Sequence, residues 1–284
     1  MVVLVKNLVD RIAKSFRVSD SMGILKAGIG SDEESLTFTE ILPNLGPGTR
    51  IEMGTEMMAV LETFQTSGTV KVLRGILGTT KTNHLVGEEF FIDPRIYRSD
   101  ILVLINDALN AMYPTLYDIG EDTFDYLTSI IGYDLPSDAD GILQVRALVD
   151  SGANYWKRIS DWEADGSVLN IRVALPSTST IEIKYRKPFT PAELETDILD
   201  DLGVAEYMQD CLFYYPMSRL MVAEEIDRSK TDTAQSHQRA QDVPPFLAVR
   251  TGEWYQARFL DAVRNARARL RRQVREVVTA GYGS

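Results

Sequence analysis

A glycine-rich stretch, VKVLRGILGTTKTNHLVG at residues 70–87, constrains the fold more than any other part of the sequence. It falls one residue short of a phosphate-binding loop: Gly75 to Thr82 reads GILGTTKT, with Thr80 where G-x-x-x-x-G-K-[ST] needs its second glycine. Such a loop must also run into a helix whose N-terminus faces the anion, whereas this one runs into EEFFIDP, an extended segment ending at Pro94. The pattern therefore predicts a strand, a turn and a strand, and no nucleotide binding.

The same stretch resembles a small β-module found in neck and tail-completion proteins of tailed bacteriophages. That module has a strand bearing a glutamate and aliphatic residues, then V-x-R-G-x-x-G-T, a histidine and a closing glycine. The matching residues are Glu56, Met58, Val60, Val72, Arg74, Gly75, Gly78, Thr79, His84 and Gly87. A proline and the helical sequence RSDILVLINDALNAMYP follow, as in those proteins. The glycines of RG-x-x-GT also have a local reason, because a tight connection needs positive φ or close backbone approach at two points.

The resemblance implies a head-to-tail adaptor (connector) protein of the phage neck. Such a protein is not an enzyme and uses no cofactor or metal. It forms a ring, of twelve copies in the family, that joins the portal protein to a stopper or tail-completion protein. DNA passes through the lumen without specific binding. The location implied is the virion neck, with the host cytoplasm during assembly.

Charge is distributed unevenly along the chain. The net charge of −11, from 41 acids and 30 bases, argues against a general nucleic-acid binder, which presents a basic face. The segment from Arg250 to Arg275, however, contains eight arginines and only two acids. Its charge is therefore +6, and the rest of the chain carries −17. The residues expected to meet a partner here are Arg258, Arg264, Arg267, Arg271, Arg272 and Arg275.

Arginine has a planar fork that suits bidentate contacts with proteins or phosphates, and this segment contains no lysine. Two interpretations stay open: a helix that docks on an acidic portal surface, or a solvated helix face. Contact of this segment with DNA is less favoured than either interpretation.

Hydrophobic periodicity divides the chain into helical and β blocks. Leu4, Leu8, Ile12 and Phe16 recur every four residues and predict an amphipathic helix within 1–20. Short alternating segments predict a β-module inserted at 21–95. Helices are expected at 96–135: one capped by Ser99, which ends before Pro114, and a second near 121–131.

A second β-module, a sheet or a sandwich, is expected at 136–188, with a hairpin turn at Asp165-Gly166. A helical region with an Arg-rich helix is expected at 189–284, including a first helix over PAELETDILDD at 191–201. The predicted fold class is thus α+β: a helical bundle with a long C-terminal helix, carrying two small antiparallel β-modules.

Cysteine usage and the first residues exclude further classes. A single cysteine, Cys211, leaves no internal disulfide and no Cys-based zinc site. The opening run MVVLVKNLVDRIAKSF is too short and too charged for a signal peptide or a spanning helix, so no membrane contact is expected.

The sequence gives little evidence for a catalytic site. Neither His84 nor His237 has a neighbouring ligand set such as H-E-x-x-H, and no G-x-S-x-G elbow occurs. His84 is expected to cap a turn or lie in the core, and His237 to be exposed. A glycan hydrolase needs two carboxylates facing each other across a cleft. The adjacent acids Glu33-Glu34, Glu88-Glu89 and Glu224-Glu225 are instead expected to be solvated.

Two tryptophans support an alternative function. Trp156 and Trp162 lie an even number of residues apart, so they can share one face of a sheet. That face would serve core packing, or a sugar-stacking platform in a carbohydrate- or receptor-binding tail or baseplate module. Exposure of either tryptophan on a concave face favours the binding module, and burial of both favours the ring protein.

Overall fold

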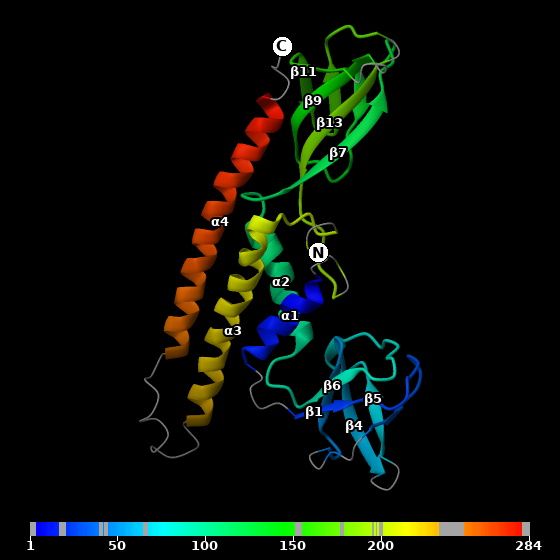
Figure 1. Cartoon of the computed structure of the whole chain (residues 1–284), viewed down its shortest axis with the longest axis vertical. Helices are drawn as coiled ribbons and strands as arrows, with labels where there is room; N and C mark the ends of the chain where they lie inside the picture. Colours follow the sequence, from blue (N-terminus) through cyan, green and yellow to red (C-terminus); the bar gives the residue numbers. More distant parts are fainter. Residues whose placement is uncertain are drawn as a thin grey trace. The chain divides into compact units, whose positions relative to one another are not determined.

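The computed structural model of the chain contains two compact units, shown in Figure 1. It describes residues 4–16, 21–39, 42, 45–64, 68–150, 155–176, 179–194, 196, 198, 201–232 and 247–279. The first unit holds Val3–Asn106 with Ala192–Thr196, and the second holds Asp107–Pro191 with Asp197–Ser284. Each unit has its own hydrophobic core.

The N-terminal helix α1 (Val5–Lys14) confirms the predicted amphipathic helix. Its buried face consists of Val5, Leu8, Val9, Ile12 and Ala13. The start of any helix leaves backbone N–H groups without intrahelical partners. Here the Val5 N–H donates to the Thr196 carbonyl at 3.0 Å and the Lys6 N–H donates to the Leu194 carbonyl at 2.9 Å. A segment far along the chain therefore completes this helix end.

The β-module of the first unit is a six-stranded antiparallel sheet, drawn in blue to cyan in Figure 1. Its strands are β1 (Ser21–Ile24), β2 (Ser35–Thr37), β3 (Arg50–Met53), β4 (Glu56–Phe64), β5 (Thr69–Arg74) and β6 (Glu89–Ile92), in the order β1-β6-β3-β4-β5-β2. The ends of the two edge strands meet, because Leu25 forms a bridge with Phe38 and the Lys26 N–H donates to the Thr37 carbonyl. The sheet is thereby curled into a half-barrel.

Inward-facing apolar side chains fill this half-barrel. They are Leu25, Ile29, Leu36, Phe38, Leu45, Ile51, Met53, Met58, Val60, Val70, Val72, Phe90 and Ile92. The alternation of buried and exposed residues along β5 follows the period of two that a half-buried strand requires.

The connection after β5 is a tight turn, as the glycines predict. Gly75, with φ 67°, precedes a 3-10 turn, η1 (Ile76–Gly78), and Gly78, with φ 79°, is the last residue of that turn. Leu77 inside this turn also has a positive φ, 56°. The chain then runs extended through His84, which bridges to Ile29, into β6. The strand–turn–strand prediction is confirmed, and no helix follows the loop.

Helix α2 (Arg98–Met112) confirms the helix expected before Pro114. It begins one residue before Ser99, so Ser99 lies in the first turn and not at the cap. Asn106 of this helix binds the backbone of Ala192 twice: its Oδ1 accepts from the Ala192 N–H at 2.7 Å, and its Nδ2 donates to the Ala192 carbonyl at 3.2 Å.

The second unit contains a β-sandwich. One sheet has the order β10-β9-β13-β7 and the other β11-β12-β8. The strands are β7 (Asp118–Asp125), β8 (Gly132–Asp134), β9 (Gly141–Asp150), β10 (Tyr155–Arg158), β11 (Trp162–Asp165), β12 (Val168–Ile171) and β13 (Thr180–Lys187). Val145, Ile183 and Leu169, from both sheets, share one core. Asp165 pairs with Val168 across the Gly166-Ser167 turn, which confirms the expected hairpin.

Two long helices complete the second unit: α3 (Gln209–Asp232), which follows a 3-10 turn, η2 (Glu206–Met208), and α4 (Leu247–Thr279). They run antiparallel, because residues later in α3 meet residues earlier in α4. The Tyr215 and Phe259 rings lie 5.1 Å apart, and Ser218 donates to Gln256 at 3.2 Å.

The predicted fold class is wrong in the weight that it gives to helices over β-sheets. Among the described residues there are thirteen strands and four α-helices, so the protein is mostly β-sheet and is not a helical bundle carrying small β-modules. Residues 118–125 form β7 where a helix was expected near 121–131. Tertiary pairing decides this, because β7 pairs with β13 along its whole length, from Asp118–Lys187 to Asp125–Thr180.

The helix expected at 191–201 is also wrong, since no described residue of that range is helical. The Leu194 and Thr196 carbonyls accept from the start of α1, and Ala192 is bound by Asn106. The backbone of this segment is therefore committed to partners outside it, and these partners outweigh its local helix propensity.

Glycine substitutions test the turn after β5. A Cβ on Gly75 would lie 3.0 Å from the Thr79 carbonyl oxygen, and both Gly75 and Gly78 have positive φ. We expect Gly75→Ala and Gly78→Val each to lower the free energy of unfolding by about 1–3 kcal/mol, measured by urea denaturation. Gly46→Ala is the matched control, because no atom lies within 4 Å of its Cβ position. Equal stability of all three variants would show that the turn needs no glycine.

Candidate functional site

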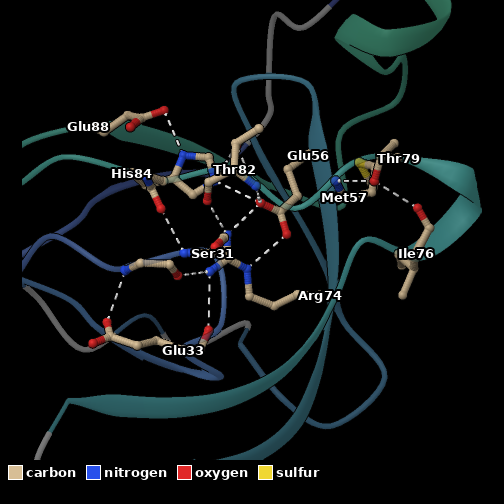
Figure 2. Close-up of polar contacts among 12 residues, drawn as sticks. Ser31, Glu33, Glu56, Met57, Arg74, Ile76, Thr79, Thr82, His84 and Glu88 are labelled. Carbon is tan, nitrogen blue, oxygen red and sulfur yellow. Dashed lines mark hydrogen bonds and ion pairs between the residues drawn. The ribbon is translucent and has the colours of Figure 1, made fainter.

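Residues of the motif at 56–87 and their neighbours form one largely buried polar cluster in the first unit, shown in Figure 2. Strand β4 supplies Glu56, strand β5 supplies Arg74, and the segment that leads into β6 supplies Thr82, His84 and Glu88. The side chains of Glu56 and Arg74 are fully buried, and that of His84 is 2% exposed. Glu56, Arg74 and His84 therefore lie inside the module, whereas Thr82 and Glu88 lie nearer its surface.

Glu56 and Arg74 form a bidentate ion pair. Arg74 Nε donates to Glu56 Oε1 at 2.8 Å, and Arg74 Nη2 donates to Glu56 Oε2 at 2.6 Å. This parallel arrangement is the strongest hydrogen-bonding geometry that these two groups can adopt. Because adjacent strands carry the two residues, the pair also fixes how β4 and β5 lie against each other.

Arg74 uses every N–H of its guanidinium. Besides the two bonds to Glu56, Nη1 donates to the carbonyls of Gly30 and Glu33, and Nη2 donates to the carbonyl of Thr82. Five donors thus have five acceptors. One side chain joins the loop at residues 30–33, strand β4 and the segment at Thr82.

His84 lies between two carboxylates. Its Nε2 is 3.0 Å from Glu56 Oε2, and its Nδ1 is 3.0 Å from Glu88 Oε1. Glu56 Oε2 also accepts from the Thr82 N–H at 2.9 Å. The sequence-based expectation that His84 is a core residue is confirmed.

These contacts change the protonation equilibria of the cluster. Burial opposes ionisation of Glu56, but the hydrogen bonds from His84, Arg74 and Thr82 outweigh it and lower its pKa from 4.5 to about 2. Burial also opposes the charged form of His84, yet Glu56 and Glu88 together raise its pKa above 6.5. Burial also opposes ionisation of Glu88, but the hydrogen bond and charge of His84, the Leu85 N–H and the charge of Lys6 together outweigh it and lower the pKa of Glu88.

The remaining motif residues shape the turn. Thr79 Oγ1 donates to the Ile76 carbonyl at 2.9 Å and accepts from the Met57 N–H at 3.0 Å. Gly87 has φ 84°, which favours glycine at the end of the turn before β6. The polar and glycine residues of the motif thus have a structural role: Glu56, Arg74, Gly75, Gly78, Thr79, His84 and Gly87.

Two backbone N–H groups of this turn are bonded within the protein and do not face an anion. The Thr79 N–H donates to the Ile76 carbonyl, and the Thr82 N–H donates to Glu56. These donors are used within the protein, whereas a phosphate-binding loop directs its N–H groups at the anion.

Sequence reasoning missed Glu88. It was grouped with Glu89 as a solvated acid, but only Glu89 is exposed, and Glu88 is partly buried against His84. The carboxylate also accepts from the Leu85 N–H at 3.1 Å. The spacing of four residues from His84 to Glu88 was the available signal. The carbonyls of Gly30 and Glu33 carry no such signal, because any residue type supplies a carbonyl.

The arginine segment lies in the second unit, on α4. Arg258, Arg264, Arg267, Arg271 and Arg272 are exposed there, and the opposite face buries Phe259, Ala266 and Leu270. Arg264 contacts Asp261 on the same helix at 3.1 Å, and Arg258 stacks over the Trp254 ring at 5.0 Å. Arg275 belongs to α4, but its side chain lies outside the described part, as do His237 and the side chains of Glu224 and Glu225.

The two tryptophans of the sandwich do not share a face. Trp156 is on β10, and Trp162 is on β11 of the other sheet. Both are partly buried: Trp162 packs on the sandwich core, and the Arg146 guanidinium lies 4.6 Å from the Trp156 ring centroid. No single platform of the two rings is formed.

A hollow of about 250 Å³ in the second unit is lined by the acids Asp118 and Glu121, among other residues. Asp118 pairs with Lys187 at 3.2 Å, and Glu121 pairs with Lys184. Each acid thus faces a lysine, whereas a glycan hydrolase sets two acids against each other.

In the part of the chain that the structure describes, no group of three or more His, Cys, Asp or Glu side chains is arranged to hold a metal ion. The one cysteine, Cys211, is buried, and burial raises the pKa of its thiol to about 12, so the thiolate is scarce at neutral pH. None of the described helices combines the length and apolar character needed to cross a membrane.

No protein-family model and no curated protein matches the chain.

Removal of the Glu56 charge tests the cluster. Glu56→Gln keeps the shape of the side chain but leaves Arg74 buried without its counter-charge, so we expect a loss of about 3–5 kcal/mol of unfolding free energy at pH 7. Glu62→Gln on the same strand is the control, because Glu62 is exposed. Urea denaturation monitored by circular dichroism measures both.

The same variant has a predictable pH dependence. A carboxyl with a pKa of about 2 when folded and 4.5 when unfolded stabilises the fold above pH 4.5, and this contribution is lost as pH falls towards 2. The shift corresponds to about 3 kcal/mol. The stability gap between wild type and Glu56→Gln should therefore narrow between pH 5 and pH 3. A constant gap would mean that Glu56 is not ionised in the fold.

Proposed function

We propose that this protein is a structural component of a tailed-phage neck: a ring-forming adaptor that joins the portal to the next stopper or tail-completion ring. The proposal takes the chain to be non-enzymatic and to use no cofactor. Its place would be the virion neck, reached by assembly in the host cytoplasm.

The observation that carries the proposal is the closed bonding of the Glu56–Arg74–His84 cluster. These are the residues on which the resemblance to neck proteins rests, and each acts on other parts of the protein. A catalytic group needs an open position for substrate, whereas these donors are paired and buried. A motif that builds a rigid module without open chemistry fits a protein whose task is assembly.

Helix α4 supports the partner side of the proposal. Its 33 residues span about 50 Å, and its exposed face carries arginines along much of that length. Arginine is enriched at protein interfaces, where its planar fork pairs with carboxylates. We infer that Arg258, Arg264, Arg267, Arg271, Arg272 and Arg275 contact an acidic surface of the portal.

The overall charge supports the proposal that DNA passes through the ring without being bound. The chain outside 250–275 carries −17, and a negative wall does not hold the phosphate backbone of passing DNA. The carbohydrate- or receptor-binding alternative would use an exposed aromatic platform, and the positions of Trp156 and Trp162 in separate sheets do not favour it.

The oligomeric state tests this function. We expect the purified chain to assemble into a closed ring, either alone or on portal-bearing heads. The expected number of copies is twelve, as in the family. Native mass spectrometry reports the free protein, and electron microscopy of heads incubated with it reports the template-bound form. A chain that stays monomeric in both experiments would contradict the proposal.

Charge reversal on α4 tests the portal contact. Arg267→Glu, Arg271→Glu and Arg272→Glu, combined in one variant, should abolish attachment to portal-bearing heads, because like charges would then face each other. Exposed substitutions of this kind usually change stability by less than about 0.5 kcal/mol each, so the variant should still fold. Co-sedimentation with heads measures attachment, and wild-type attachment should weaken with added salt.

The matched control reverses three exposed lysines of the first unit: Lys14, Lys26 and Lys81. Its attachment should equal that of the wild type. If the α4 variant attached as well as this control, the arginine face would be solvated or face the lumen, and the portal contact would lie elsewhere.

A further inference from the structure

The bonding around His84 requires a positively charged ring. A neutral imidazole has one N–H and one lone pair, and only the imidazolium donates from both nitrogens. Both ring nitrogens of His84 lie 3.0 Å from carboxylate oxygens, which only accept hydrogen bonds when ionised. In the neutral form one lone pair would face a carboxylate at that distance, with the Thr82 hydroxyl, 3.3 Å from Nε2, as the one other donor in reach. The two carboxylates at shorter distance therefore favour the protonated ring.

The four hydrogen-bonded groups of the cluster balance in charge when His84 carries its proton. Strand β4 contributes Glu56, strand β5 contributes Arg74, and Glu88 lies just before β6. The two carboxylates, the guanidinium and the imidazolium sum to zero. Lys6 of α1 also acts electrostatically on Glu88. Loss of the His84 proton would leave these four groups with one net negative charge, which is costly beside the fully buried Glu56.

The contact of His84 with Glu88 also orders a surface turn. Glu88 Oε2 accepts from the Leu85 N–H at 3.1 Å, and the Glu88 N–H donates to the Leu85 carbonyl at 3.2 Å. The turn ends at Gly87, whose N–H donates to the Leu25 carbonyl. Leu85 and Val86 at its tip are 75% and 68% exposed. The Glu88 side chain thus connects this turn to the buried His84.

We propose that residues 84–88 form a proton-dependent latch, in which protonated His84 holds Glu88 and fixes the Leu85–Gly87 turn. Loss of the proton on Nδ1, which faces the partly exposed Glu88, releases the turn, while the remaining N–H on Nε2 stays with the fully buried Glu56 and the sheet stays folded. The remaining anchors of the cluster do not involve the His84 proton, because Arg74 binds Glu56 directly. The effect is therefore local to the turn.

The direction of the pH dependence follows from the two carboxylates. They raise the pKa of His84 above its ordinary 6.5, so the contribution of this proton to stability is complete below pH 6.5 and is lost as pH rises through the folded value. The latch is closed in mildly acidic solution and opens on the alkaline side.

The chain has only two histidines, so ¹⁵N labelling of histidine gives a direct test on the full-length protein. The ring-nitrogen shifts separate the imidazolium from both neutral tautomers, and His84→Asn identifies the His84 signals. We expect His84 to be an imidazolium at pH 6 and to titrate above pH 6.5. The variant Glu88→Gln should lower that midpoint, and Glu89→Gln, its exposed neighbour, should not.

Hydrogen exchange measured by mass spectrometry reports the turn. After correction for the intrinsic pH dependence of amide exchange, protection of residues 85–88 should fall about tenfold per pH unit above the His84 midpoint, while protection in β4 stays constant. A neutral His84 at pH 6 would overturn the proposal. Unchanged protection of the turn across the midpoint, or an equal loss in β4, would overturn it too.

Discussion

The buried ion pair between Arg74 and Glu56 is the interaction on which the β-module depends. Neither side chain is exposed, so each charge must be neutralised and hydrogen-bonded within the protein. A guanidinium has five N–H groups, and Arg74 finds five acceptors on β4, the loop at residues 30–33 and the segment at Thr82. These pieces of chain must lie where those acceptors are needed, and the fold around Arg74 follows from this requirement.

The backbone geometry of the turn after β5 follows from the same Arg74–Glu56 ion pair. The chain must leave β5 at Arg74 and return within eight residues, so that the Thr82 carbonyl meets Nη2 and the Thr82 N–H meets Glu56. Positive φ at Gly75 and Gly78 makes so short a return possible. Leu77 has the same backbone region without being glycine, a local strain that the surrounding bonds maintain. The motif therefore encodes the backbone geometry of this turn.

The rigid β-module and the basic helix are the two features that support the proposed role in assembly. Preorganised surfaces lose little conformational entropy when they dock, and a network with every donor paired keeps its shape before a partner arrives. The charge distribution adds selectivity, because the arginines of α4 attract acidic surfaces while the strongly negative remainder repels nucleic acid. The proton on His84 completes the charge balance of the module, and the order of one surface turn thus depends on pH.

The sequence by itself determined the local features. Periodicity located α1, α2 and α4, glycine located the turn after β5, and the Asp165-Gly166 pair located a hairpin, because each rests on contacts within a few residues. The burial of His84 also followed from its motif. Only the tertiary structure decided that 118–125 is a strand, that 191–201 is not a helix, and that Glu88 belongs with His84. In each case the deciding partner is a strand, a helix end or a buried ring, and propensity within the segment carries no information about it.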